Sequence, residues 1–397
     1  MRKYIFYIFI LIFLILSFFM IEKKQTQKVL KEENGEKKAV FLSYIELNKY
    51  IKNKDEKTSK SNIVNILDNM KDFKFNMLIV HVRPFSDAIY NSDIYPISET
   101  VKNNNKAPNY DVLDYIIQEA KKRNIEVHAW INPYRISNDT DITKISKDNP
   151  AYNLIDTDAV EIVEEKGIFY NPASEEVKNL IISGVKELVS NYEIDGIHLD
   201  DYFYPDADID IDSYKTYIEQ GGSLSLSDYR YNNILTLIKE VYSTIKEINN
   251  NVVFGISPEG NIENNYNKHY LDVKKILSEE GYIDYIMPQI YFGFLNEVKP
   301  FTKTVEEWND MIKVDNIKII PALAFYKVGE YDKYAKSGCN EWIENNDIIA
   351  NQILESRELS NYYGFALFRY DYIFDGGKYN NTTLEEIENL KDVLNNN

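Results

Sequence analysis

Short apolar runs alternate with longer amphipathic segments between residues 39 and 368. The short runs have the length and apolar content of buried strands, and the longer segments repeat apolar residues at helical spacing. The expected strands occupy residues 39–45, 75–82, 125–131, 194–199, 252–257, 282–290, 317–324 and 363–368. The clearest helices are expected at residues 61–71, 110–123, 175–191 and 227–249. This alternation predicts parallel strands joined by right-handed crossovers.

Eight strand–helix units in roughly 350 residues predict an α/β protein, a closed (β/α)8 TIM barrel with inserted loops. We assign the barrel to residues 39–397. The alternative is an open doubly wound sheet. It fits less well because no Gly-x-Gly-x-x-Gly run follows the first strand, and the Gly221-Gly222 pair lies in a Ser-rich loop before a helix.

The chain begins with a segment of a different kind. Two basic residues precede an apolar run over residues 4–21, which is near the lower limit for a membrane span and longer than most signal-peptide cores. No small-x-small cleavage site follows the run. We therefore expect residues 1–21 to be an uncleaved signal anchor in the cell membrane, or a secretion signal if the segment is cleaved. Basic residues before the span place the barrel outside the cytoplasm, after a flexible tether at residues 22–38.

Composition narrows the possible partners. The net charge of −18, from 63 acidic and 45 basic residues, argues against a nucleic-acid partner, because phosphate backbones are bound by concentrated Lys and Arg. The single cysteine, Cys339, excludes intramolecular disulfides and cysteine-rich zinc sites. We expect no nucleic acid and no cofactor.

The run YEIDGIHLDDYFYP at residues 192–205 is the most informative stretch. It has the pattern of a buried strand that ends abruptly at Asp200 and Asp201, with Gly196 permitting close approach of a neighbour. Side chains alternate along a strand, so His198 and Asp200 share one face, and we expect Asp200 alone to face the barrel axis unless the backbone bends. The alternative is a solvated acidic turn that caps the next helix. Three aromatic residues directly after the acids disfavour that alternative.

Polar and aromatic residues also follow the other strands. In a (β/α)8 barrel the carboxyl-terminal ends of the strands form the mouth that holds the active site. The candidate substrate-binding residues are Arg83, Asp87, Trp130, Asn132, Tyr134, Arg135, His198, Tyr202, Tyr204, Asn261, Gln289, Tyr291 and Tyr326. Such a mixture suits a hydroxyl-rich ligand whose sugar faces stack on aromatic rings. The expected stacking walls are Trp130, Tyr202, Tyr204 and Tyr291.

Six runs occur in the same order as in a known family. HVRPFSDAIY, VHAWINPYRIS, DGIHLDDYFYP, GISPEGNIENNY, YIDYIMPQIYFGF and YGFALFRYDY resemble those of glycosyl-hydrolase-like family 10 proteins, and the resemblance spans nearly all of residues 39–375. It implies a (β/α)8 barrel, an extracytoplasmic setting and hydrolysis of a glycan, with bacterial cell-wall (peptidoglycan) glycan strands as the expected substrate. It does not fix the catalytic pair.

The fourth strand is also similar to the Asp-Gly-x-Asp-x-Asp-x-Glu motif of family 18 chitinases, but Tyr202 stands where that motif has its terminal Glu. The proton donor must then come from elsewhere, and Glu259 after the fifth strand is the natural candidate. We expect Asp200 to act as nucleophile or to stabilise an oxocarbenium-like transition state. Glu259 would be the general acid, with a pKa raised by burial among aromatic rings. Asp201 is the alternative to Asp200, since a bend at the strand end would exchange the two.

Two other protein classes stay open. His81, His128 and His198 on neighbouring strands could bind zinc with an aspartate, as a metal-dependent polysaccharide deacetylase would require. The first two lie several residues below the strand ends, so we expect core histidines and no metal. A glycan-binding barrel without turnover would keep the aromatic residues and lose one carboxylate.

Two arginines have two possible roles each. Arg83 and Arg135 follow the second and third strands and would either bind a substrate carboxylate, such as a lactyl or uronic acid group, or pair with an aspartate of the barrel.

Overall fold

The computed structural model describes residues 35–201 and 203–395. The predicted signal anchor and residues 22–34 of the predicted tether lie outside the described residues. Within them, no helix combines the length and the apolar content that a membrane span requires. The compact unit that contains the sheet begins at Lys38.

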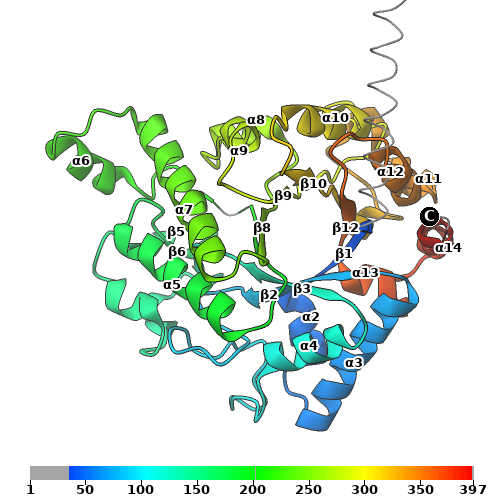
Figure 1. The fold of residues 1–397 in the computed structure, drawn as a ribbon, viewed down its shortest axis with the longest axis horizontal. Helices are drawn as coiled ribbons and strands as arrows, with labels where there is room; N and C mark the ends of the chain where they lie inside the picture. The colour runs from blue at the N-terminus through cyan, green and yellow to red at the C-terminus, as the bar shows by residue number, and fades with distance from the viewer. Residues whose placement is uncertain (1–34, 202, 396–397) are drawn as a thin grey trace, which may run out of the picture. The chain divides into compact units, whose positions relative to one another are not determined.

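A parallel sheet of nine strands forms the centre of this unit (Figure 1). The strands lie in the order β10-β9-β8-β7-β3-β2-β1-β12-β11. Their bounds are β1 (Lys37–Leu42), β2 (Met77–Arg83), β3 (Glu126–Ile131), β7 (Gly196–Leu199), β8 (Val253–Ile256), β9 (Tyr285–Ile286), β10 (Lys318–Ile319), β11 (Ala322–Ala324) and β12 (Gly364–Phe368). Each of the eight predicted strand regions contains an observed strand. The prediction of an α/β fold with parallel strands is therefore confirmed.

The two ends of this sheet meet. Only Ile320 and Pro321 separate β10 from β11, and this one stretch pairs with β9 on one side and with β12 on the other. The Ile320 amide donates to the Ile286 carbonyl, while the Pro321 carbonyl accepts from Ala366 on the opposite neighbour. The sheet is thus curled into a ring, as Figure 1 shows. An open doubly wound sheet does not have this pairing.

Helices lie around the outside of the ring (Figure 1). Their bounds are α2 (Tyr44–Tyr50), α3 (Glu56–Asp72), α4 (Val112–Lys121), α5 (Glu175–Asn191), α6 (Ile211–Glu219), α7 (Leu226–Ile248), α8 (Ile262–Asn267), α9 (Val273–Ser278), α10 (Phe301–Met311), α11 (Glu341–Glu344), α12 (Ile348–Ser356), α13 (Tyr370–Phe374) and α14 (Asn381–Asn395). Side-chain oxygens of Asp55, Asp111, Ser174 and Ser225 cap the first turns of α3, α4, α5 and α7. The four predicted helices are all observed.

A small antiparallel sheet was not predicted from the sequence. Its strands lie in the order β4-β6-β5, with bounds β4 (Arg135–Ser137), β5 (Val160–Val163) and β6 (Gly167–Tyr170). It is inserted between β3 and α5. The strands are short, and β4 follows β3 closely in the sequence, so no separate apolar run predicts this sheet.

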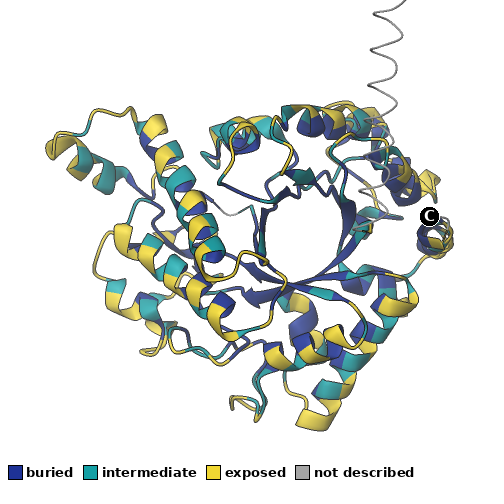
Figure 2. Cartoon of the chain, in the orientation of Figure 1, coloured by how far each residue is buried: buried dark blue, intermediate teal, exposed yellow. Residues whose placement is uncertain are grey.

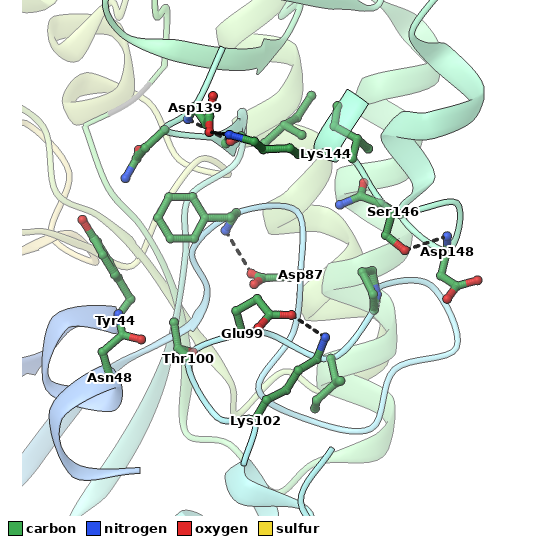
Figure 3. A pocket seen from close by; sticks show the side chains of 18 of the residues that line it. Tyr44, Asn48, Asp87, Glu99, Thr100, Lys102, Asp139, Lys144, Ser146 and Asp148 are labelled. Carbon is green, nitrogen blue, oxygen red and sulfur yellow. Dashed lines mark hydrogen bonds and ion pairs between the residues drawn. The ribbon is translucent and has the colours of Figure 1, made fainter. Parts of the chain in front are cut away.

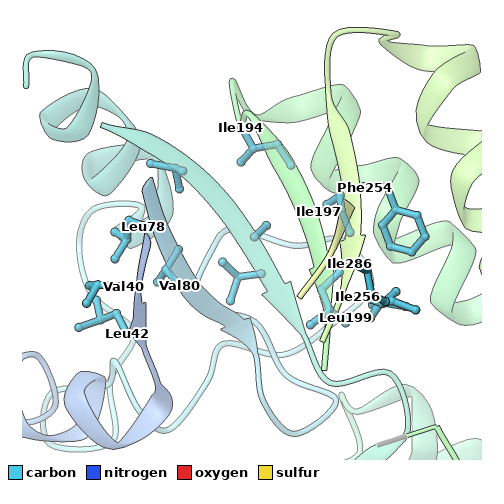
Figure 4. Close-up of a cluster of buried hydrophobic side chains, with 14 of the residues drawn as sticks. Val40, Leu42, Leu78, Val80, Ile194, Ile197, Leu199, Phe254, Ile256 and Ile286 are labelled. Atoms are coloured by element: carbon cyan, nitrogen blue, oxygen red, sulfur yellow. The ribbon is translucent and has the colours of Figure 1, made fainter. Parts of the chain in front are cut away.

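Alternation along the strands separates two apolar regions. Residues such as Val40, Leu42, Val80 and Ile197 point from the sheet towards the helices and form the main core (Figure 4). A smaller cluster, which includes Phe41 and the side chains on alternate positions of neighbouring strands, fills the inside of the ring. The strands are accordingly buried on both faces, whereas the helices expose their outer sides (Figure 2).

The inside of the ring also holds a polar layer. The Tyr285 hydroxyl lies 3.0 Å from His128 Nδ1 and 2.9 Å from His198 Nδ1. Glycines leave room for these rings, because a Cβ at Gly196 would lie 2.4 Å from His128 Nδ1 and one at Gly255 would lie 2.1 Å from the Tyr285 ring. The predicted close approach at Gly196 is confirmed.

The third histidine lies elsewhere in the ring. His81 stacks on the Trp130 ring with 3.7 Å between ring centroids. Within residues 35–201 and 203–395, no group of three or more His, Cys, Asp or Glu side chains is arranged to hold a metal ion.

Candidate active site

A cavity of about 390 Å³ opens at the carboxyl-terminal rim of the ring. Residues after β1, β7, β8, β9, β11 and β12 contribute to its walls. The lining residues are Phe41, Ser43, Tyr44, Ile45, His81, Trp130, Arg135, Asp200, Asp201, Ser257, Gln289, Tyr291, Tyr326, Phe368, Arg369 and Tyr372. Two of them, Asp200 and Asp201, carry carboxylates, and most of the others carry aromatic rings or hydrogen-bonding groups.

Asp200 is held in place by two N–H donors. Its side chain is buried, with 4% of the residue exposed, and Oδ2 accepts from Trp130 Nε1 at 3.0 Å and from Asn132 Nδ2 at 3.1 Å. Strand register explains this contact. Trp130 pairs with His198 across β3 and β7, so Asn132 and Asp200, each two residues further along, reach the rim at the same level. Two N–H donors suit a carboxylate that carries negative charge.

Asp201 lines the same cavity. β7 ends at Leu199, so strict alternation does not continue through the two aspartates. Both aspartates therefore line the cavity, which is the stated exception to strict alternation. Burial raises the pKa of Asp201, and the charge of Glu259 acts in the same direction. The charge of His269 and a hydrogen bond from Gln289 lower it, but the net pKa lies above its ordinary value.

Glu259 does not line this cavity. Its carboxylate accepts a hydrogen bond from Asn264 Nδ2 and lies 3.2 Å from His269 Nε2. Burial raises the pKa of Glu259, but the hydrogen bonds from His269 and Asn264 and the charges of His269 and Lys268 outweigh burial, so the pKa lies below its ordinary value. The expected raised pKa is wrong. The reason is local, because α8 begins three residues after Glu259 and brings Asn264 against its carboxylate.

Two of the predicted tyrosines lie away from the cavity. Tyr204 is buried, and its hydroxyl donates to Asp210 Oδ2 at 2.7 Å. Arg230 on α7 donates from Nε to the same carboxylate at 2.9 Å and from Nη1 to the Tyr270 hydroxyl at 2.7 Å. This buried network ties the loop after β7 to α7. Tyr204 is therefore part of the loop's anchor and not a stacking wall, and Tyr134 is likewise buried outside the cavity.

Other candidates have structural positions. Arg83 is buried with its guanidinium 4.4 Å from the Tyr95 ring centroid, and His198 belongs to the polar layer inside the ring. Asn261 caps α8 by accepting from the Glu263 amide. Asp87 lines a second cavity, considered below. Tyr202 lies outside the described residues.

The structure brings seven of the sixteen candidate residues together around one cavity. They are Trp130, Arg135, Asp200, Asp201, Gln289, Tyr291 and Tyr326. Asn132 does not line the cavity, but its side chain donates a hydrogen bond to Asp200. Tyr44 and Arg369 also line the cavity but were not predicted. Arg369 directly follows the eighth strand, where the strand-end rule finds it, whereas Tyr44 fell inside the expected first strand, which ends earlier, at Leu42.

Arg369 lies in a buried cluster of charges at the cavity wall. Its Nε donates to Glu46 Oε1 at 2.7 Å and to Asp371 Oδ1 at 3.0 Å. Burial and the hydrogen bond and charge of Asp371 raise the pKa of Glu46 to about 7, although Arg369 and Ser43 act to lower it. The Arg369 guanidinium thus contacts two carboxyl groups, Glu46 and Asp371. Arg135, the second arginine at the cavity, places its guanidinium 4.6 Å from the Phe85 ring centroid.

The curled parallel sheet, with paired acids and aromatic rings at its carboxyl-terminal rim, defines a protein of the glycoside hydrolase type. The PgaB (BpsB) glycoside hydrolase domain from Bordetella bronchiseptica has a similar fold, with a TM-score of 0.63 at 14% identity over 91% of this chain and 99% of that chain. Alpha-L-fucosidase isoenzyme 2 from Paenibacillus thiaminolyticus gives a TM-score of 0.58 at 13% identity, over 91% of this chain and 49% of that one. At these identities the likeness concerns the fold.

The chain belongs to the glycosyl hydrolase-like 10 family, whose model matches residues 36–339. Glycosyl hydrolase YngK of Bacillus subtilis (strain 168) is 34% identical over 294 residues, which are 68% of this chain but 57% of that protein's length. Glycosyl hydrolase DigH of Escherichia coli (strain K12) is 31% identical over 337 residues, 78% of this chain and 75% of that protein. The family resemblance predicted from the six runs is confirmed.

The Glu46 cluster predicts how stability depends on pH. Because the pKa of Glu46 is raised from 4.5 to about 7, its protonated form contributes stability that is complete below the unfolded pKa and is lost as the pH rises through 7. The melting temperature should therefore fall between about pH 5 and about pH 8. Glu46→Gln, which keeps an acceptor for Ser43, should reduce this fall.

Thermal melts across the pH range check this expectation, with Glu306→Gln on an exposed face as the matched control. Part of the pH dependence will persist in the Glu46 variant, because burial also raises the pKa of Glu386 to about 7. If the melting temperature of Glu46→Gln depended on pH as strongly as that of the wild type, the result would contradict the raised pKa of Glu46.

Proposed function

We propose that this protein is a glycoside hydrolase of the (β/α)8-barrel type that cleaves a polysaccharide, with bacterial cell-wall glycan strands as the substrate. One observation carries the proposal. Two adjacent aspartates line one cavity, and their environments differ. Asp200 accepts hydrogen bonds from two N–H donors, whereas burial raises the pKa of Asp201. Carboxyl groups in unlike environments are how glycosidases divide the roles of acid and charge stabiliser.

The two roles follow from these environments. Asp201, which keeps its proton to higher pH than a solvated aspartate, protonates the oxygen of the leaving sugar. The Asp200 carboxylate, which accepts the two N–H hydrogen bonds, faces the positive charge that develops at the anomeric carbon. The glycosidic C–O bond breaks and a water oxygen bonds to that carbon, while the water gives a proton to the Asp201 carboxylate and so restores the acid. Glu259 acts through Asp201, because its negative charge contributes to the raised pKa of the acid.

The cavity walls fit a sugar chain. Tyr291 packs against Tyr326 at 5.8 Å between ring centroids, and Phe368 lies 5.8 Å from Tyr291. These rings offer apolar faces for sugar rings, beside the acids. Arg135 places a guanidinium at the same cavity, which suits a carboxylate on the substrate such as the lactyl group of a cell-wall sugar. Arg369 is already paired with Glu46 and Asp371.

The assignment of acids predicts an order among three variants. Asp201→Asn should lower turnover of cell-wall glycan strands by roughly 10²- to 10⁴-fold, because general acid catalysis contributes about that much. Asp200→Asn should lose at least as much. Glu259→Gln should retain turnover within about tenfold of the wild type, since it tunes the acid without reaching the substrate.

These assays measure released reducing ends on purified glycan strands, after circular dichroism has shown that each variant is folded. Near-wild-type turnover by Asp201→Asn would remove it from the role of acid. A loss at Glu259→Gln as large as that at Asp201→Asn would return the role to Glu259.

We further propose that the barrel lies outside the cytoplasmic membrane, held by an uncleaved span at residues 4–21. The supporting observation is the apolar run preceded by basic residues. Protease added to intact, wall-stripped cells should release the barrel from the cell. A barrel that stays fully protected, or a mature chain that begins after residue 21, would contradict the anchor.

A further inference from the structure

A second cavity lies beside the candidate active site, and we call it the distal cavity (Figure 3). Its volume is about 610 Å³, against about 390 Å³ for the active-site cavity. Its walls come from α2, from the loop after β2 and from the segment that follows β4. Tyr44 lines both cavities, so the two spaces are neighbours. In Figure 3, Tyr44 and Asn48 face Ser146 and Asp148 across the cavity, with Asp87 between them.

A fixed aromatic wall continues from one cavity into the other. The rings of Tyr44 and Phe85 meet edge to face with 5.0 Å between their centroids. The Arg135 guanidinium lies 4.6 Å from the Phe85 centroid and 5.6 Å from the Tyr44 centroid, and its Nε donates to the Pro84 carbonyl. Arg135 lines the active-site cavity and Phe85 lines the distal one. Rings held in this way present flat faces to sugar units without a large entropic cost.

The charges of the distal cavity exclude a strongly anionic ligand. Two of its three lysines are paired with carboxylates, Lys102 with Glu99 at 2.5 Å and Lys144 with Asp139. Carboxylates outnumber lysines along the walls. The carboxylates are Asp87, Glu99, Asp139, Asp141 and Asp148, and the lysines are Lys52, Lys102 and Lys144. A phosphate-bearing chain would meet net negative charge there.

The remaining polar groups suit hydroxyl and acetamido groups. Asp87 accepts from the Phe85 amide at 3.1 Å, and burial raises its pKa to about 6. Near that pH its carboxyl both donates and accepts hydrogen bonds, as sugar hydroxyls require. Ser137, Asn138 and Ser146 add neutral donors and acceptors to the wall.

We propose that the distal cavity binds a neutral N-acetylhexosamine unit of the same glycan chain whose other units occupy the active-site cavity. The inference rests on the proposed function, because that function places the rest of the glycan in the active-site cavity. It adds a binding site for the glycan beyond the cavity that holds the two aspartates. A chain too short to extend past Tyr44 occupies the active-site cavity alone, whereas a longer chain fills both.

Filling the distal cavity tests this proposal. Ser146 is exposed at the cavity wall, and Ser146→Trp would occupy the space without disturbing the core. Lys147→Trp is the matched control, because Lys147 is the exposed neighbour and does not line the cavity. Both changes are made in the full chain carrying Asp201→Asn, so that turnover does not consume the ligand. Isothermal titration calorimetry then compares neutral N-acetylglucosamine oligosaccharides of two and six units.

The six-unit oligosaccharide should bind at least about tenfold more tightly than the two-unit one, and Ser146→Trp should remove most of that difference while leaving two-unit affinity unchanged. Lys147→Trp should change neither affinity. Equal affinity for the two lengths, no binding of either, or the same loss in both tryptophan variants would overturn the proposal. If the binding pattern holds but the wild-type chain cleaves no glycan, the proposed function fails and the distal site stands.

Discussion

The parallel register of β2, β3, β7 and β8 decides which side chains meet inside the ring. Register aligns His81 with Trp130, Trp130 with His198, and His198 with Gly255. The glycine at the end of this row makes room for the Tyr285 ring, whose hydroxyl lies within hydrogen-bond distance of Nδ1 of two buried histidines. A one-residue slip would turn these polar groups towards the helices and the aliphatic residues inwards. The register is thus fixed by a polar layer as well as by apolar packing.

The same register positions the acids. Two residues beyond the row of Trp130 and His198, the strands reach the rim, and there Asn132 meets Asp200. Asp201 comes next on the chain, where the strand has ended, and therefore lines the same cavity with a different environment. The loop that follows is held to α7 by the buried Arg230–Asp210 pair, so the acids sit between a rigid strand and an anchored loop. Breaking such a buried pair is costly, because an unpaired charge stays behind.

Sequence patterns were sufficient for the framework and for part of the site. The strands were predictable because each is a short run of apolar residues between turns, and the rule that barrel strands end at the active site located Asp200, Asp201, Gln289 and Tyr291. The small sheet of β4, β5 and β6 escaped because its strands are short and continue from loops. Side-chain partners were not predictable. Glu259 follows its strand as expected, but Asn264 and His269 from the next helix and loop engage its carboxylate.

Distant partners also explain the remaining errors. Tyr204 has the position of a stacking residue in the sequence, but its hydroxyl donates to Asp210, which also binds Arg230 on α7. Arg369 pairs with Glu46, more than three hundred positions earlier in the chain, and no local pattern records that contact.

Isotope incorporation into cell-wall glycan strands tests the central claim most directly. Strands digested in water enriched with oxygen-18 and analysed by mass spectrometry should yield shorter chains that each carry one heavy oxygen at the new reducing end, and Asp201→Asn should yield almost none. Shorter chains without the label would mean that water is not the acceptor. Chains of unchanged length, whether intact or only deacetylated, would contradict hydrolysis at the paired aspartates.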